Sequence, residues 1–223
     1  MKKRYIALLG LALLLSGCAP SEETPTLSGS ESRLEETAVQ EDLKALYLDP
    51  ATLPALDLDL AHTAEADGRR FSLEDGVDTE LELPVYYTWL AEITGDFDTV
   101  RSYSCDALAG ELDAAEQNYA EGLGFASVTL HSLTTLPADC LDQARDERVE
   151  EVRETVEREG LTDFALVEAE VSWTYTTAAE EQAPQLPAGT YTRTYLVGRT
   201  GVDTPLKIYE VTWETFTPEW VEG

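Results

Sequence analysis

The chain has 223 residues, of which 44 are Asp or Glu and only 15 are Lys or Arg, so its formal net charge is −29 at pH 7. Nucleic-acid binding depends on Lys and Arg that neutralise phosphates, and this composition therefore argues against a nucleic-acid partner. The same negative charge opposes electrostatic attachment to anionic lipid headgroups. The length suits one domain of ordinary size with a tail.

Residues 1–17 have the pattern of a signal peptide. Three basic residues, Lys2, Lys3 and Arg4, precede an apolar run from Ile6 to Leu15, and small residues follow it. A basic segment, a short apolar segment and a small-residue cleavage site are typical of an export signal that is removed from the mature protein. The run is too short for a stable membrane span, because crossing a hydrocarbon core of ~30 Å takes about 20 residues.

Leu15-Ser16-Gly17-Cys18 resembles the lipobox of bacterial lipoproteins, in which Leu lies three residues before the lipid-bearing Cys. The resemblance implies that diacylglycerol is attached to the Cys18 sulfur and that cleavage leaves Cys18 as the mature N-terminus. A diacyl group holds a protein stably on a membrane, whereas one short acyl chain holds it only marginally. We therefore expect an exported protein that the lipid on Cys18 anchors to the outer face of the bacterial membrane. An ordinary secretory signal with an incidental cysteine is the alternative.

Residues 18–40 are rich in Ser, Thr, Glu, Pro and Gly and poor in large apolar side chains, which predicts a flexible acidic tether. Residues 41–83 give a mixed pattern. A short helix with Leu43, Leu46 and Tyr47 on its inner side is expected first, and weak alternation with turn residues follows it. We expect this segment to pack on the domain rather than to extend the tether, because it contains several Leu residues and Phe71.

Residues 84–122 predict a series of helices. Pro84 suits the first residue of a helix, where its missing N–H costs nothing. A single apolar stripe follows, at Tyr86, Trp89, Leu90 and Ile93. Gly95 is a candidate C-terminal cap, and further helices are expected around Val100 and over residues 108–119.

Alternation of apolar and polar side chains predicts four strands, over residues 125–136, 164–177, 190–199 and 207–217. A charged helix over residues 142–159 lies between the first two strands. One apolar face and one wet face is what an antiparallel sheet covered on a single side requires. The sequence thus predicts an α+β domain with helices packed on one face of a mainly antiparallel four-stranded sheet.

The segment Tyr87–Val100, in which Gly95-Asp96-Phe97 follows the first helix, resembles part of the NTF2-like (cystatin-like) fold. In that family an amphipathic first helix commonly ends in a Gly-Asp-aromatic turn. The order of elements over residues 84–217 is similar to the same family. The resemblance implies a curved sheet wrapped around a helix, with a cone-shaped cavity between them. Such domains serve as enzymes, ligand carriers and assembly modules, so the resemblance does not settle function.

Six aromatic residues are expected to converge where the first helix meets the sheet: Trp89, Trp173, Tyr175, Tyr195, Tyr209 and Trp213. Their indole N–H and phenol O–H groups could orient a small apolar ligand in a pocket. Alternatively, these side chains fill the core, since a domain of ~135 residues needs large anchors to bury roughly two-thirds of its unfolded surface.

His131 is the candidate acid–base residue, because a histidine side chain titrates near neutral pH. We expect it on one strand face with Phe125, Ser127, Thr129 and Leu133; a hydrogen-bonded strand histidine without a catalytic role is the alternative. The chain contains no Gly-x-Ser-x-Gly, His-Glu-x-x-His, phosphate-loop or calcium-loop pattern, so we expect no metal and no cofactor.

Cys105 and Cys140 form either a disulfide, which export would permit, or two buried free thiols. Together the patterns favour a non-enzymatic lipoprotein domain that binds a small apolar ligand or a protein partner. Two alternatives stay open. One is a small hydrolase or isomerase that uses His131 in the cavity, and the other is a homodimer formed through the open face of the sheet.

Overall fold

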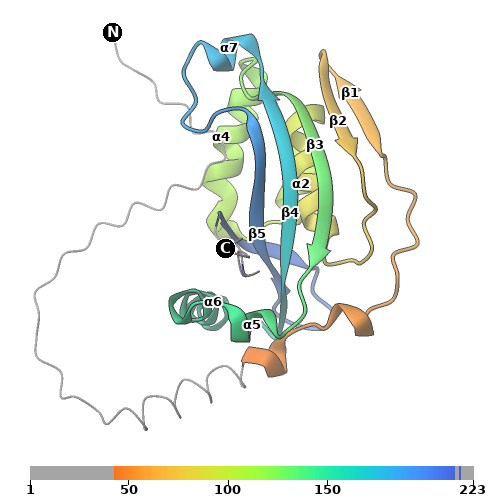
Figure 1. The fold of residues 1–223 in the computed structure, drawn as a ribbon, viewed down its shortest axis with the longest axis vertical. Helices are drawn as coiled ribbons and strands as arrows, with labels where there is room; N and C mark the ends of the chain where they lie inside the picture. Colours follow the sequence, from red (N-terminus) through yellow and green to blue (C-terminus); the bar gives the residue numbers. More distant parts are fainter. Residues whose placement is uncertain (1–42, 214–215, 217–223) are drawn as a thin grey trace, which may run out of the picture.

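The computed structural model describes residues 43–213 and Phe216, and within them six strands form one sheet (Figure 1). The strands follow the order of the chain: β1 (Thr63–Ala66), β2 (Arg69–Leu73), β3 (Phe125–Thr135), β4 (Asp163–Tyr175), β5 (Gly189–Arg199) and β6 (Lys207–Thr212). Neighbouring strands are antiparallel except for β2 and β3, which are parallel. Parallel neighbours need a long crossover, and the helices between β2 and β3 provide it.

The helices of the described residues are α2 (Leu83–Thr94), α3 (Phe97–Ser102), α4 (Ala109–Ala120), α5 (Cys140–Gln143), α6 (Asp146–Glu159) and α7 (Thr177–Glu180). The described residues also contain a helical turn at residues 43–46 and two short 3-10 helices, Pro50–Thr52 and Asp106–Leu108. In this part of the chain, no helix is both long enough and apolar enough to cross a membrane. Gly95 caps α2 in a left-handed conformation with φ of 77°, as the sequence indicated.

The prediction of an α+β domain with a mainly antiparallel sheet is confirmed, but the prediction of four strands is wrong. The two additional strands, β1 and β2, lie in the segment 41–83 and form a hairpin. Its turn is Asp67-Gly68, and both residues have positive φ, of 52° and 77°, as a tight hairpin turn requires. The strands are only 4 and 5 residues long, too short for their alternation to stand out.

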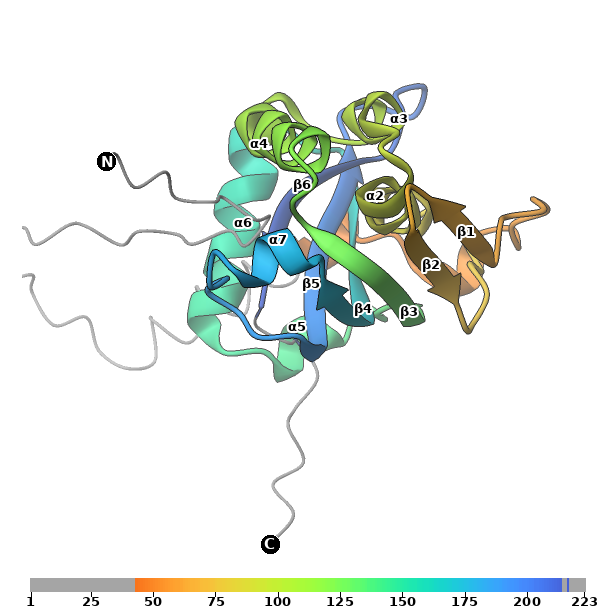
Figure 2. The same cartoon turned by 90° about the horizontal axis from the view of Figure 1, so that it is seen from above.

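The helices also lie on both faces of the sheet, not on one. We call the face that α2, α3 and α4 cover the inner face, and the opposite one the outer face (Figure 2). Helix α6 packs on the outer face near β6, where Thr155 Oγ1 donates a 2.8 Å hydrogen bond to Glu210 Oε2. The reason is that β4 begins with four consecutive buried residues, 164–167, and a strand that is apolar on both sides must be covered twice.

The segment that begins at Leu43 packs into the same core as the sheet. The Tyr47 ring meets Phe164 edge to face at 5.1 Å. The Tyr47 hydroxyl donates to the carbonyl of Leu136 at 2.8 Å and accepts from the backbone N–H of Leu166 at 3.0 Å. Burial raises the pKa of this hydroxyl, so it stays neutral and available as a donor. One side chain thus joins the segment to both β4 and the residue that follows β3.

Removing this hydroxyl tests whether the segment stabilises the domain. We expect Tyr47→Phe to lower the free energy of unfolding by about 1–3 kcal/mol, because a buried N–H and a buried carbonyl lose their partner. The control is Tyr191→Phe, because the Tyr191 hydroxyl donates to the carbonyl of Pro187 in an exposed setting. This change should lower the free energy of unfolding by less than about 0.5 kcal/mol. Urea denaturation measures both, and equal losses would contradict the expectation.

Candidate functional site

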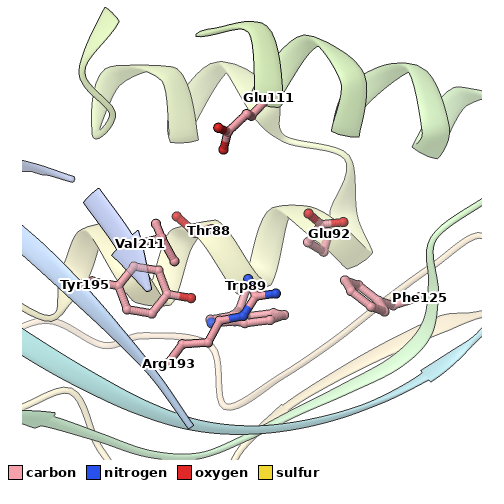
Figure 3. Close-up of a pocket in the computed structure, with 8 residues that line it drawn as sticks. All are labelled: Thr88, Trp89, Glu92, Glu111, Phe125, Arg193, Tyr195 and Val211. Carbon is pink, nitrogen blue, oxygen red and sulfur yellow. The ribbon is translucent and has the colours of Figure 1, made fainter. Parts of the chain in front are cut away.

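A pocket lies between α2, α4 and the inner face of the sheet (Figure 3). The cavity itself is small, with about 30 Å³ available to the centres of water-sized spheres, and the space free of protein atoms reaches about 400 Å³ only when open solvent is included. Its walls come from Thr88, Trp89, Glu92, Glu111, Phe125, Arg193, Tyr195 and Val211. These residues belong to α2, α4, β3, β5 and β6, so the pocket forms only when the sheet and the helices have assembled.

Local periodicity explains why these side chains meet. On α2, Trp89 and Glu92 are three residues apart and therefore lie on one side of the helix. On β5, Arg193 and Tyr195 are two residues apart and share the inner face. Val211 of β6 is the cross-strand partner of Tyr195 and points to the same side. A helix face and a strand face thus supply the two main walls.

Glu92 is the most unusual group in the pocket. Its residue is only 7 % exposed, yet its carboxyl group makes no hydrogen bond and no ion pair with another described residue. Burial raises its pKa to about 7, while the positive charges of Arg193 and Arg69 limit the rise. At neutral pH the group is therefore divided between its acid and its carboxylate form, so it can donate or accept a proton.

Glu82, just before α2, shows how this protein satisfies a buried carboxylate elsewhere. It is 3 % exposed and accepts hydrogen bonds from the backbone N–H of Asp78, Thr79 and Thr135, and from the Thr135 hydroxyl. Buried polar groups in native structures are hydrogen-bonded as a rule. Glu92 departs from that rule within the same 11-residue stretch, roughly three helical turns away.

Arg193 faces Glu92 from the sheet and is 6 % exposed. Its guanidinium carbon lies 3.7 Å from the ring centroid of Trp213 and 5.2 Å from that of Trp89. Burial lowers its pKa, and the neighbouring Tyr195 and Glu92 oppose this effect. Aromatic faces stabilise a cation electrostatically, so they help to keep a positive charge inside the domain.

Two neutral donors of the pocket wall also lack partners. The Tyr195 hydroxyl and the Trp89 indole nitrogen are buried and make no hydrogen bond of good geometry with another described residue. Burial raises the pKa of Tyr195, and the nearby Arg193 and Trp89 oppose the rise, so the Tyr195 hydroxyl interacts with both neighbours at less than ideal alignment. Glu111 of α4 faces the same space from above, and burial raises its pKa too.

The structure divides the six aromatic residues predicted as a site. Trp89 and Tyr195 line the pocket. Trp173 stacks on Trp89 at 5.9 Å, and Tyr175 stacks on Phe125 at 5.4 Å, so both pack behind the pocket wall. Trp213 also lies on the inner face, against Arg193 and Trp173. The interpretation as a ligand pocket therefore applies to Trp89 and Tyr195, and the interpretation as core packing applies to Trp173 and Tyr175.

Tyr209 is the one member that does not join the others. It lies at an irregularity in the pairing of β5 and β6, between the pairs of Leu196 and Val197. Its carbonyl oxygen is 3.9 Å from the Sγ of Cys105, a residue that precedes α4 in the chain. The extra residue at this irregularity explains why simple alternation with Val211 misplaces the Tyr209 side chain.

Of the eight pocket residues, only Trp89 and Tyr195 were predicted as site residues from the sequence, and Glu92 and Arg193 are the buried charged residues among the other six. A signal for each was present. Glu92 lies three residues after Trp89 and one before Ile93, in the middle of the apolar stripe of α2. Arg193 lies between Tyr191 and Tyr195 on the apolar side of its strand. A charged residue on an apolar face is the pattern to look for, because a protein buries a charge only at a cost.

His131 does not line the pocket but lies on the outer face. Two irregularities in the β3–β4 pairing, at Phe125/Ser127 and at Leu130/Ser132, change the face of the flanking residues. Phe125 and Leu133 are therefore buried on the inner side, and the prediction that they share a face with His131 is wrong. Each bulge adds one residue and shifts the alternation by one.

Cys105 and Cys140 are both free and buried, and the disulfide considered from the sequence is not formed. Cys140 lies 3.8 Å from the Tyr47 hydroxyl, and burial raises the pKa of its thiol to about 11. Burial likewise raises the pKa of Cys105. Within the described ranges, no group of three or more His, Cys, Asp or Glu side chains is arranged to hold a metal ion. Cys18 and its lipobox lie outside the described residues.

The raised pKa of Glu92 predicts a stability that depends on pH. On folding the pKa rises from 4.5 to about 7, so between these values the folded state holds a proton that the unfolded state has lost. The contribution of Glu92 to the free energy of unfolding is therefore fully present below pH 4.5, and it is lost as the pH rises towards 7. As the pH rises from 5 to 8, the free energy of unfolding of Glu92→Gln should increase by roughly 2–3 kcal/mol relative to that of the wild type. Urea denaturation at each pH measures the difference. The exposed Glu154, changed to Gln, should reproduce the wild-type dependence, and a Glu92→Gln curve parallel to the wild type would contradict the expectation.

Comparison of the chain with known protein families, with curated proteins and with solved structures finds no match. The side chains of the pocket and the pattern of the sequence are therefore the features that indicate function.

Proposed function

We propose that this chain is a membrane-anchored, extracytoplasmic lipoprotein whose domain binds a small ligand, without turning it over, in the pocket between α2 and β5. The observation that carries the proposal is the carboxyl group of Glu92, which is buried in the pocket wall without a hydrogen bond or an ion pair among the described residues. A ligand that donates a hydrogen bond to this group would supply the missing partner.

Energetics favours this function over simple packing of the core. Leaving a buried polar group without a partner costs about 1–3 kcal/mol, whereas an apolar side chain of the same shape can be neutral or stabilising. The Tyr195 hydroxyl and the Trp89 indole N–H are buried without a hydrogen-bond partner among the described residues, and both line the pocket together with Glu92. A core that needed only filling would be as stable with apolar side chains at these positions, so binding is the better explanation.

The pocket walls indicate the chemistry of the ligand. Trp89, Phe125 and Val211 offer apolar surface, which suits a small ring or a short hydrocarbon. Glu92 accepts a hydrogen bond when ionised, while Tyr195 and Trp89 can donate one each. A ligand with an apolar body and a head that both donates and accepts, such as a primary amide, satisfies all of these groups.

The proposed cellular position rests on the lipobox resemblance of Leu15–Cys18. Lipid on Cys18 would hold the protein on the outer face of the membrane, and residues 18–40 would separate the binding domain from the surface. We also assign the domain to the NTF2-like (cystatin-like) fold. The position of α2 on the inner face of the sheet supports this assignment, and so does its end at Gly95-Asp96-Phe97.

Binding of benzamide tests the pocket. Benzamide carries a ring, an N–H donor and a carbonyl acceptor, whereas toluene has the ring alone. We expect ligand-observed NMR to show benzamide bound to the wild-type protein more strongly than toluene. Tyr195→Phe removes one donor and should weaken benzamide binding by roughly 3–10-fold, the value of one hydrogen bond. Glu92→Leu should remove the preference for benzamide over toluene.

Tyr191→Phe is the matched control for the benzamide experiment, because its hydroxyl bonds to Pro187 outside the pocket. It should bind benzamide as the wild type does. Equal binding of benzamide and toluene to the wild-type protein would overturn the proposed ligand chemistry. An equal loss in the two Tyr→Phe variants would overturn the assignment of the site.

Replacing the lipidated cysteine tests the anchor. We expect Cys18→Ala to release the protein from the membrane fraction of the producing bacterium. The diacyl group on Cys18 is the proposed anchor, and its loss removes the stable attachment. Membrane fractionation followed by immunoblotting measures the change. Cys105→Ala should leave the protein attached, and a membrane-bound Cys18→Ala variant would contradict the proposed localisation.

A further inference from the structure

Three side chains on the outer face of the sheet form a continuous hydrogen-bonded chain, which we call the outer triad: Glu74, His131 and Ser172. Glu74 Oε2 lies 2.7 Å from His131 Nδ1, and His131 Nε2 lies 2.5 Å from Ser172 Oγ. The three residues come from the end of β2, from β3 and from β4, which are neighbours in the sheet. The outer triad is separated from the pocket by the whole thickness of the sheet.

A β-bulge creates this arrangement. The pairing of β3 with β4 shifts between Leu130 and Ser132, so His131 is the inserted residue and its side chain is directed to the outer face. Bulges often re-aim a side chain next to a functional site. The His131 side chain is 27 % exposed and the Glu74 side chain 61 %, and no helix covers this part of β2, β3 and β4 (Figure 1). The group is thus accessible to a molecule from solution.

The hydrogen bonds assign a role to each ring nitrogen of His131. The Nδ1 atom that faces the Glu74 carboxylate carries the proton, because a carboxylate can only accept. The Nε2 atom is then the acceptor and faces the Ser172 hydroxyl. A carboxylate that holds the histidine tautomer, with a histidine base that takes the serine proton, is the geometry of serine hydrolases on several unrelated folds. Thr190 lies 2.7 Å from Ser172 Oγ on the other side and can hold the serine rotamer.

A groove beside the outer triad provides room for a substrate. It lies along β1, β2 and β3, offers about 460 Å³ to water-sized spheres, and includes Arg70, Ser72 and Thr129 among its walls, while the three triad residues lie beyond its lining. Thr129 is the direct cross-strand partner of Ser172. The Thr129 hydroxyl accepts a 3.0 Å hydrogen bond from Ser72, which leaves its own proton free to point into the groove. Such a donor next to the nucleophile can stabilise an oxyanion.

We propose that the outer triad is a second site, which hydrolyses small carboxylic esters. The Ser172 oxygen attacks the ester carbonyl while its proton passes to His131 Nε2, and an oxyanion forms near Thr129. The C–O bond to the leaving alcohol breaks, and the alcohol takes the proton from His131. Water then attacks the acyl-Ser172 ester with His131 as base, which releases the acid and restores the serine. Ser172 and His131 are the catalytic residues, and Glu74 is a positioning residue.

The experiment uses the purified full chain, a fluorophosphonate probe and p-nitrophenyl acetate. We expect the probe to label Ser172, as located by peptide mass spectrometry, and the ester to be hydrolysed. Ser172→Ala should lose both label and turnover, and His131→Gln should lower turnover at least about 100-fold, the usual contribution of a general base. Glu74→Gln should lower kcat while KM stays unchanged, a split that a purely structural role would not produce.

Ser102→Ala is the matched control, because Ser102 lies on α3, where its hydroxyl donates to the carbonyl of Thr99 at 2.6 Å. It should keep wild-type labelling and turnover. An unlabelled Ser172, a Ser172→Ala protein that hydrolyses at the wild-type rate, or an equal loss in Ser102→Ala would each overturn the proposal. Thermal melting checks that every variant is folded, and if Ser172→Ala unfolds, His131→Gln decides the question alone. Because benzamide binding involves the other face, its outcome is independent of this one.

Discussion

The packing of Trp89 on Trp173 is the contact on which the rest of this domain depends. The two rings stack at 5.9 Å, and Phe125 lies against both of them at 6.1 and 5.5 Å. This aromatic group joins α2 to the inner face of β3 and β4, and large aromatic side chains contribute more to a core than any other residues. The pocket is the space that remains beside it, so the position of α2 on the sheet decides both the size of the pocket and the direction in which Glu92 points.

The domain treats its two buried glutamates in opposite ways. Glu82 is surrounded by backbone and hydroxyl donors that join the start of α2 to the end of β3. Glu92, near the end of α2, faces Arg193, makes no ion pair with another described residue, and has a pKa raised to about 7. A satisfied buried carboxylate rigidifies a structure, whereas an unsatisfied one stores a cost that binding can recover. This contrast supports a structural role for Glu82 and the proposed binding role for Glu92.

The sheet separates two chemically distinct surfaces. Its inner face carries aromatic side chains, a buried cation and a carboxyl group, which suit the retention of a small ligand. The exposed part of its outer face carries hydroxyl groups and the outer triad, with hydrogen bonds that cross from β2 to β5. Because side chains alternate along each strand, residues next to each other in the chain serve opposite surfaces; Ser172 and Trp173 are an example. The bulge at His131 is what adds the base to the row of hydroxyls.

The sequence by itself determined what depends on neighbours along the chain. The apolar stripe at Tyr86, Trp89, Leu90 and Ile93, the cap at Gly95 and the alternation in the long strands indicated the main elements and the α+β class, because period and capping are local properties. Only the tertiary structure decided the pairing of β1 and β2, the face of each residue beside a bulge, and the cover of α6 on the outer face. It also decided that the Glu92 carboxyl group has no hydrogen bond from another described residue while Glu82 has four donors, and that His131 lies within hydrogen-bond distance of both Glu74 and Ser172. These features depend on contacts between residues far apart in the chain, and one inserted residue in a strand reverses every face that follows it.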